Sequence, residues 1–158
     1  MTPKIKTNWH LYTPDLEISF PSMKSWVEEN NSLMNRLRLH ETKIDLIVLD
    51  EQICEHHDAQ TSAEPVIGNL RKILLKSDHN LVFAESFFSQ GVIKEFAKFG
   101  RLEEEPLGKY LFSDSNIKKH ETYIADYELD DQTFLGRKCI YSYNDQKFSV
   151  IEVFLFNE

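Results

Sequence analysis

The sequence predicts a single α+β domain in which a six-stranded antiparallel sheet carries helices on one face or at one end. Six segments alternate apolar and polar residues, or are continuously apolar, as strands do. Shorter segments space their apolar residues as helices do, and two of these precede the first strand. With 158 residues, 41% hydrophobic content and no Gly/Ser- or Pro-rich linker, the chain fits one domain over residues 1–158.

Two short helices are expected after an irregular N-terminal segment that covers residues 1–21. Ser22 is a candidate N-cap for a helix that carries Trp26 at helical spacing. Ser32 is a candidate N-cap for a second helix, in which Leu33 belongs to the apolar stripe. Two helices therefore lead the predicted fold.

The six predicted strands follow, and turn-forming residues mark the hairpins between them. They cover residues 42–53, 66–76, 81–88, 116–129, 135–143 and 147–156. Ser77-Asp78-His79-Asn80 and Asn144-Asp145-Gln146 have turn chemistry, which predicts two of the hairpins. A polar loop over residues 54–65 and a helix over residues 91–99, ended by Gly100, account for most of the remaining chain.

The least generic stretch is Pro106-Leu107-Gly108-Lys109-Tyr110-Leu111-Phe112. Proline suits the first turn of a helix, and Gly108 lets another group approach the backbone closely. The stretch is therefore expected to be a short helical turn that presses an apolar surface onto the rest of the protein. A turn that closes the core and a turn that covers a ligand site both fit these residues.

The charge of the chain limits its partners. A formal net charge of -8 opposes nonspecific attraction to nucleic acid and to anionic lipid, so the expected partner is a small molecule. No run approaches the roughly 18 apolar residues needed to span a membrane, and residues 1–12 lack a signal-peptide core. A cytoplasmic monomer is expected, in which Cys54 and Cys139 are reduced thiols.

Two charged residues fall on apolar faces of predicted strands. Arg71 shares its face with Ile73 and Leu75, and Glu152 shares its face with Val150 and Phe154. A buried charge costs several kcal/mol unless it has a partner, a ligand or water. An internal Arg71–Glu152 ion pair with a structural role and a site for a polar ligand both remain possible explanations.

Other candidate sites are weaker. Glu85 is either a third inward charge or an edge position that reaches solvent. Cys54, His56 and His57 are not expected to bind a metal, because adjacent histidines on a flexible loop make a poor tetrahedral site. The GxSxG, GxxxxGK[ST] and GxGxxG motifs of common hydrolases and nucleotide-binding proteins are absent.

Four segments, in order, resemble those of bacterial chorismate lyases, and the likeness extends from about Ser22 to the end of the chain. They are Leu70-Arg71-Lys72-Ile73-Leu74-Leu75, the stretch from Pro106 to Phe112, Leu135-Gly136-Arg137-Lys138, and Ile151-Glu152-Val153-Phe154-Leu155. The proline-leucine-glycine motif with its aromatic tail is the most specific of the four. The family splits chorismate into 4-hydroxybenzoate and pyruvate at the start of ubiquinone synthesis.

The resemblance implies a role for each of the two charged residues on apolar strand faces. An arginine at the position of Arg71 holds the carboxylate of the aromatic product, and a glutamate at the position of Glu152 meets its hydroxyl end and helps to move a proton. Backbone groups at the positions of Leu33 and Leu107 complete the family's pocket, which lies under helical flaps. No metal or redox cofactor is implied, because aromatisation drives the reaction.

One departure from the family concerns Glu85, which stands in Ala84-Glu85-Ser86 where the family has an arginine. If Glu85 faces the pocket, its charge repels an anionic substrate unless it is protonated or paired. A noncatalytic protein that binds an aromatic or cyclohexadienyl carboxylate on the same scaffold is therefore the alternative to a lyase. Effector domains of some transcription regulators have a similar fold, but no room for a DNA-binding domain is expected before Ser22. A structural or interaction role is the remaining possibility.

Overall fold

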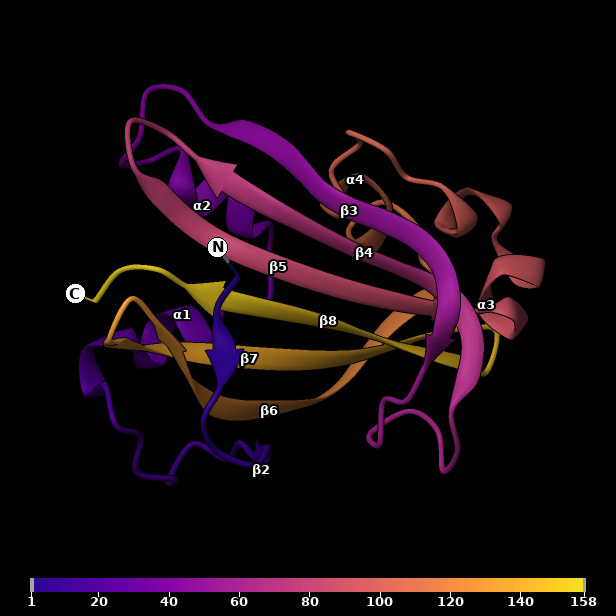
Figure 1. The fold of residues 1–158 in the computed structure, drawn as a ribbon, viewed down its shortest axis with the longest axis horizontal. Helices are drawn as coiled ribbons and strands as arrows, with labels where there is room; N and C mark the ends of the chain where they lie inside the picture. Colours follow the sequence, from indigo (N-terminus) through magenta and orange to yellow (C-terminus); the bar gives the residue numbers. More distant parts are fainter. Residues whose placement is uncertain (1, 158) are drawn as a thin grey trace.

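A strongly twisted antiparallel sheet forms the centre of the computed structural model, which describes residues 2–157 (Figure 1). The sheet has eight strands in the order β1-β6-β7-β8-β5-β4-β3, and β2 also pairs with β6. The six long strands are β3 (Asp45–His56), β4 (Val66–Lys76), β5 (Asn80–Ser89), β6 (Ile117–Leu129), β7 (Gln132–Tyr143) and β8 (Gln146–Phe154). These correspond to the six predicted strands, and the α+β class of a single domain is confirmed.

The two additional strands correct the prediction that residues 1–21 are irregular and that the sheet has six strands. Strands β1 (Lys4–Ile5) and β2 (His10–Leu11) pair with β6 in antiparallel register. Between them, the Thr7 hydroxyl accepts a hydrogen bond from the Asp126 N–H at 3.0 Å. Two residues are too few to show a period of two, so the sequence pattern gave no sign of these strands.

Tight hairpin turns set the register of the C-terminal strands. Asn144 and Asp145 join β7 to β8 with φ values of 47° and 69°. Asp130 and Asp131 join β6 to β7 with φ values of 51° and 63°. Two successive positive φ angles are typical of the turn whose twist matches that of the flanking strands, and Asn and Asp tolerate them. The hairpin predicted at Asn144-Asp145-Gln146 is confirmed.

The helices are short and lie mainly over one face of the sheet and at one end of it (Figure 1). They are the 3₁₀ turn η1 (Pro21–Met23), α1 (Lys24–Val27), α2 (Leu33–Leu37), α3 (Gln90–Glu95), the 3₁₀ turn η2 (Ala97–Gly100) and α4 (Gly108–Leu111). In the described part of the chain, no helix has the length and apolar character needed to cross a membrane.

The two predicted helix caps have different outcomes. The Ser32 hydroxyl accepts a hydrogen bond from the Asn35 N–H at 3.2 Å, so this cap of α2 is confirmed. The prediction for Ser22 is wrong, because Ser22 lies inside η1 and caps nothing. Pro21 starts that turn one residue earlier, since its fixed φ suits a first helical position.

Apolar side chains cover both faces of the sheet. On the helical face, Trp26 of α1 packs with Phe154 in a cluster that includes residues of α2, β4 and β8. On the other face, Phe83, Tyr127 and Val153 form a separate cluster against which Trp9 of the N-terminal segment packs. The central strands are therefore buried on both sides, and a charged side chain on either face of them needs a partner.

Candidate active site

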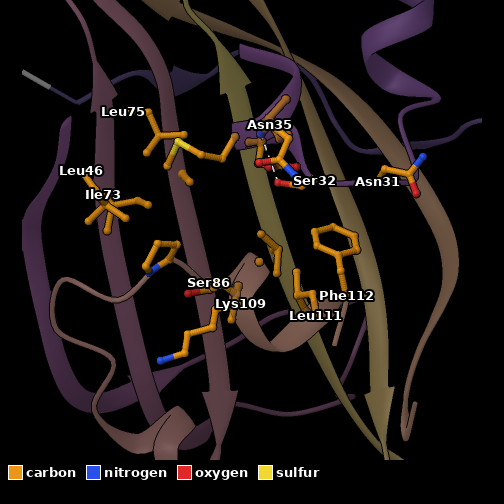
Figure 2. Close-up of a pocket in the computed structure, with 18 of the residues that line it drawn as sticks. Asn31, Ser32, Asn35, Leu46, Ile73, Leu75, Ser86, Lys109, Leu111 and Phe112 are labelled. Atoms are coloured by element: carbon orange, nitrogen blue, oxygen red, sulfur yellow. Dashed lines mark hydrogen bonds between the residues drawn. The ribbon is translucent and has the colours of Figure 1, made fainter. Parts of the chain in front are cut away.

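A cavity of about 360 Å³ lies between the helical face of the sheet and the segments that carry α2 and α4 (Figure 2). Its volume is in the range of small-molecule sites. Leu46, Ile73 and Leu75 form one apolar side of it, and Leu111 and Phe112 of the α4 turn lie across from them (Figure 2). The stretch from Pro106 to Phe112 therefore forms a short helical turn, as predicted, and this turn covers the cavity.

Leu33 and Leu107 both line this cavity. Leu33 is the first residue of α2, and Leu107 is the cap residue of α4. The N–H groups at these positions have no partner within their own helices, because the first N–H groups of a helix lack a preceding carbonyl. Both covering segments thus have backbone donors without a partner in their own helix at residues that line the cavity.

Arg71 of β4 lines the cavity although only 2% of its surface is exposed. Its Nη2 donates to the carbonyl oxygens of Glu103 at 2.8 Å and Glu105 at 2.7 Å, and its Nε donates to that of Glu103 at 3.3 Å. Nη1 makes no hydrogen bond to the described residues, which leaves its N–H groups for a ligand.

The loop that holds Arg71 is itself anchored by Glu51 of β3. The Glu51 carboxylate accepts hydrogen bonds from the N–H groups of Leu102 and Glu103, both at 2.8 Å, and from the Asn69 side chain at 2.9 Å. Partial burial acts to raise the pKa of Glu51, but these hydrogen bonds outweigh it and lower the pKa below its usual value. Burial lowers the pKa of Arg71, and the charge of Glu51 opposes that shift.

Glu152 of β8 also lines the cavity, and Arg137 of β7 binds its carboxylate. The Arg137 Nε donates to Glu152 Oε1 at 2.8 Å, across a directly paired position of the two strands. Burial disfavours the charged form of Arg137, but the carboxylate of Glu152 more than compensates, so the pKa of Arg137 lies above its usual value.

The structure corrects the partner expected for Glu152. An internal Arg71–Glu152 ion pair was one explanation of the two inward charges, but Arg137 is the cation bound to Glu152. Arg71 instead binds main-chain carbonyls. The missed residue had a signal in the sequence, since Arg137 shares a strand face with the apolar Leu135 and with Cys139.

Arg71 and Glu152 are far enough apart for a small ring to fit between their side chains. Arg71 lies opposite Ser86 of β5, whereas Glu152 lies opposite Ala84 of β5. Two strand spacings separate β4 from β8, which corresponds to about 10 Å between the strands. A cation and a carboxylate thus face one apolar cavity from two different strands.

Glu85 does not line this cavity. It lies on the other face of the sheet, opposite Lys72 in register, and the two side chains approach to 4.0 Å. Strand β5 is flanked by β4 and β8, so Glu85 is not at a sheet edge either. Its side chain contributes instead to a second, smaller cavity of about 210 Å³ that Lys138 also lines. The repulsion expected of a pocket-facing Glu85 therefore does not apply.

Among the described residues that line the main cavity, Glu152 is the one of a type that binds metals. His56 and His57 line the second cavity, while Cys54 is not part of either. In the described part of the chain, Glu41, Asp78 and His79 are the three such side chains that come close together, at the surface near the β4–β5 turn.

Comparison with known proteins shows a match over almost the whole chain. The family described as chorismate lyase matches residues 5–158. A probable chorismate pyruvate-lyase of Pseudoalteromonas translucida is 28% identical over 149 residues, which cover 84% of this chain and 83% of the relative. Proteins of the same name from Pseudoalteromonas atlantica and Photobacterium profundum are 25% and 24% identical, each over 89% of this chain and over 82% and 81% of the relatives.

Proposed function

Because this chain belongs to the chorismate lyase family, we propose that it is a chorismate pyruvate-lyase that releases 4-hydroxybenzoate and pyruvate and so supplies the first step of ubiquinone synthesis. The names of its relatives support this activity. The observation that carries the proposal is that Arg71 and Glu152, from separate strands, line one largely apolar cavity under α2 and α4.

In this proposal Arg71 binds the ring carboxylate. The bonds from Nε and Nη2 to main-chain carbonyls fix the guanidinium plane, and Nη1 donates to the ligand. Hydrogen bonds between a cation and a carboxylate are stronger than neutral ones, and more so where water is excluded. The backbone N–H groups of Leu33 and Leu107 add donors from the covering segments.

Glu152 is proposed to act near the ring carbon that carries the hydroxyl. That carbon loses its proton, and the C–O bond at the neighbouring carbon breaks with its electrons leaving on enolpyruvate. The ring becomes aromatic, and enolpyruvate gains a proton to become pyruvate, so the reaction needs no oxidant or reductant. In this proposal Glu152 accepts the ring proton, and positioning in a largely apolar cavity accounts for much of the rate.

The proposal is tested by incubating the purified protein with chorismate. We expect 4-hydroxybenzoate, detected by its ultraviolet absorbance, and an equal amount of pyruvate, detected with lactate dehydrogenase. Glu152→Gln keeps the shape of the side chain and should abolish most turnover, whereas Glu85→Gln, on the other sheet face, is the matched control. Tight binding of 4-hydroxybenzoate without any product from chorismate would instead identify a noncatalytic binding protein.

A further inference from the structure

Arg137 joins two parts of the molecule that are more than 100 residues apart in sequence. Its Nε donates to Glu152, and its Nη1 donates to the carbonyl oxygens of Trp26 at 2.8 Å, Val27 at 3.2 Å and Glu29 at 2.9 Å. Only 3% of its surface is exposed. One guanidinium therefore contacts both the carboxylate in the cavity and the main chain at the end of α1.

The main-chain contacts lie where a short helix needs them. The carbonyls in the last turn of a helix have no partner within it, and α1 consists of Lys24–Val27 only. A cation at this end satisfies those carbonyls and interacts favourably with the helix dipole. Three residues lie between Glu29 and Leu33, so the segment that Arg137 holds leads directly into α2.

The contact with Glu152 fixes the carboxylate by one oxygen. Oε1 accepts from Arg137, and Oε2 makes no hydrogen bond to the described residues. The planar guanidinium donates in a fixed direction, unlike an ammonium group, so it fixes the position of Oε1. Oε2 is thereby left as the oxygen that can meet a ligand in the cavity.

We propose that Arg137 is a positioning residue that couples the placement of the Glu152 carboxylate to the position of residues 24–37, called here the α1–α2 cover because its α2 part lies over the cavity. When the cover is in place, its carbonyls hold Arg137, and Arg137 holds Glu152 in the orientation needed for proton transfer. This inference rests on the proposed function for its kinetic consequence. Its structural consequence, that the cover depends on Arg137, is independent of that function.

The neighbouring residue provides a matched control. Lys138 is 5% exposed and binds the Asp58 carboxylate at 2.9 Å, so it is a buried cation of an ion pair on the same strand. It points to the other sheet face and does not line the main cavity. Loss of Lys138 therefore leaves the buried carboxylate of Asp58 unpaired, as loss of Arg137 leaves the partly buried carboxylate of Glu152 unpaired, without touching the cover or Glu152.

The first measurement compares turnover of chorismate by Arg137→Gln, Arg137→Lys and Lys138→Gln. Small misplacements of reacting groups reduce rates steeply, so we expect kcat of Arg137→Gln to fall on the order of 10- to 100-fold. The KM should change less than about threefold, because Arg71 still binds the carboxylate. Arg137→Lys lacks the planar fork that binds both groups at once, but it keeps the buried positive charge. It should therefore disturb folding less than Arg137→Gln does and show an intermediate kcat.

The second measurement is amide hydrogen exchange without ligand. We expect Arg137→Gln and Arg137→Lys to lose protection in residues 24–37 while the central strands keep theirs, and Lys138→Gln to retain protection in residues 24–37. Equal losses of kcat in the two Gln variants, or unchanged protection of residues 24–37 in the Arg137 variants, would overturn the inference. If the wild type does not turn over chorismate, the proposed function fails, and hydrogen exchange alone then decides whether the cover depends on Arg137.

Discussion

Main-chain carbonyls rather than a carboxylate fix the guanidinium of Arg71. We therefore expect Arg71→Ala to weaken binding of 4-hydroxybenzoate by about 2 to 5 kcal/mol, the usual cost of removing one partner of a buried charge pair. Titration calorimetry measures this change. Lys72→Ala is the control, because Lys72 follows Arg71 on β4 but pairs with Glu85 on the other face. Unchanged affinity in a folded Arg71→Ala variant would assign Arg71 a purely structural role.

Successive residues of a strand face opposite sides of the sheet, so the face on which Glu85 lies decides whether its charge affects ligand binding. Because Glu85 lies away from the main cavity and beside Lys72, Glu85→Gln should leave the affinity for 4-hydroxybenzoate nearly unchanged. Loss of the partly exposed pair should cost stability by about 1 kcal/mol at most. Calorimetry and urea unfolding test the two statements. A marked gain of affinity in Glu85→Gln would show that its charge does reach the ligand.

Single residues were predictable from the sequence where they broke a pattern. Alternation placed Arg71 and Glu152 on apolar faces, and both line the cavity. Alternation does not say which strands are neighbours, so it could not show that β7 brings Arg137, and not Arg71, beside Glu152. Glu51 anchors the loop that binds Arg71, and this contact depends on the loop conformation. A loop leaves no periodic pattern of apolar residues in the sequence, so the contact could not be predicted.

At the scale of elements, the close packing of β4 against β5 depends on Gly68. A Cβ atom at this position would lie 2.2 Å from the carbonyl oxygen of Phe88, which is part of the backbone and cannot move aside. We expect Gly68→Ala to lower the free energy of unfolding by about 3 kcal/mol, at the upper end of ordinary overpacking. Urea unfolding measures this loss.

Gly91→Ala is the control for that prediction. There the nearest atom is the side-chain oxygen of Gln146 at 2.5 Å, which a flexible side chain can withdraw. Alanine also favours the helix in which Gly91 lies. We expect little change or a small gain of stability in Gly91→Ala, and an equal loss in both variants would contradict the backbone argument.

The long strands were predicted well, whereas two short strands and one helix cap were not. The six long strands each supply enough residues to show alternation or a continuous apolar run, and turn residues separate most of them. The pairs Lys4–Ile5 and His10–Leu11 are held by β6, a partner more than 100 residues away, so no local signal marks them. Ser22 failed as a cap because a neighbouring proline started a different kind of turn.

For the whole molecule, Glu51 links the stability of the fold to pH. Its folded-state pKa is below the ordinary value of 4.5, so its ionised form stabilises the fold. This contribution is complete above the unfolded-state pKa and is lost as the pH falls through the lowered folded-state pKa. We expect Glu51→Gln to reduce stability by about 1 to 3 kcal/mol near neutral pH, with a smaller difference at about pH 3. Urea unfolding at both pH values tests this, and a difference that grows in acid would contradict it.

The binding of Arg71 by the carbonyl oxygens of Glu103 and Glu105 also affects how ligands should change the melting temperature of the protein. Carbonyl dipoles accept from Nε and Nη2 of the guanidinium, but they carry no net charge to neutralise it. An aromatic acid would bring that missing charge, whereas an amide of the same shape would not. A ligand that binds only the folded state stabilises it by an amount that grows with the logarithm of its concentration over Kd, about 2.7 kcal/mol at a hundredfold excess, and so raises the melting temperature. The thermal midpoint should therefore rise with 4-hydroxybenzoate and stay nearly constant with 4-hydroxybenzamide. The thermal stability of the protein would thus distinguish a carboxylate from a neutral ligand of the same shape.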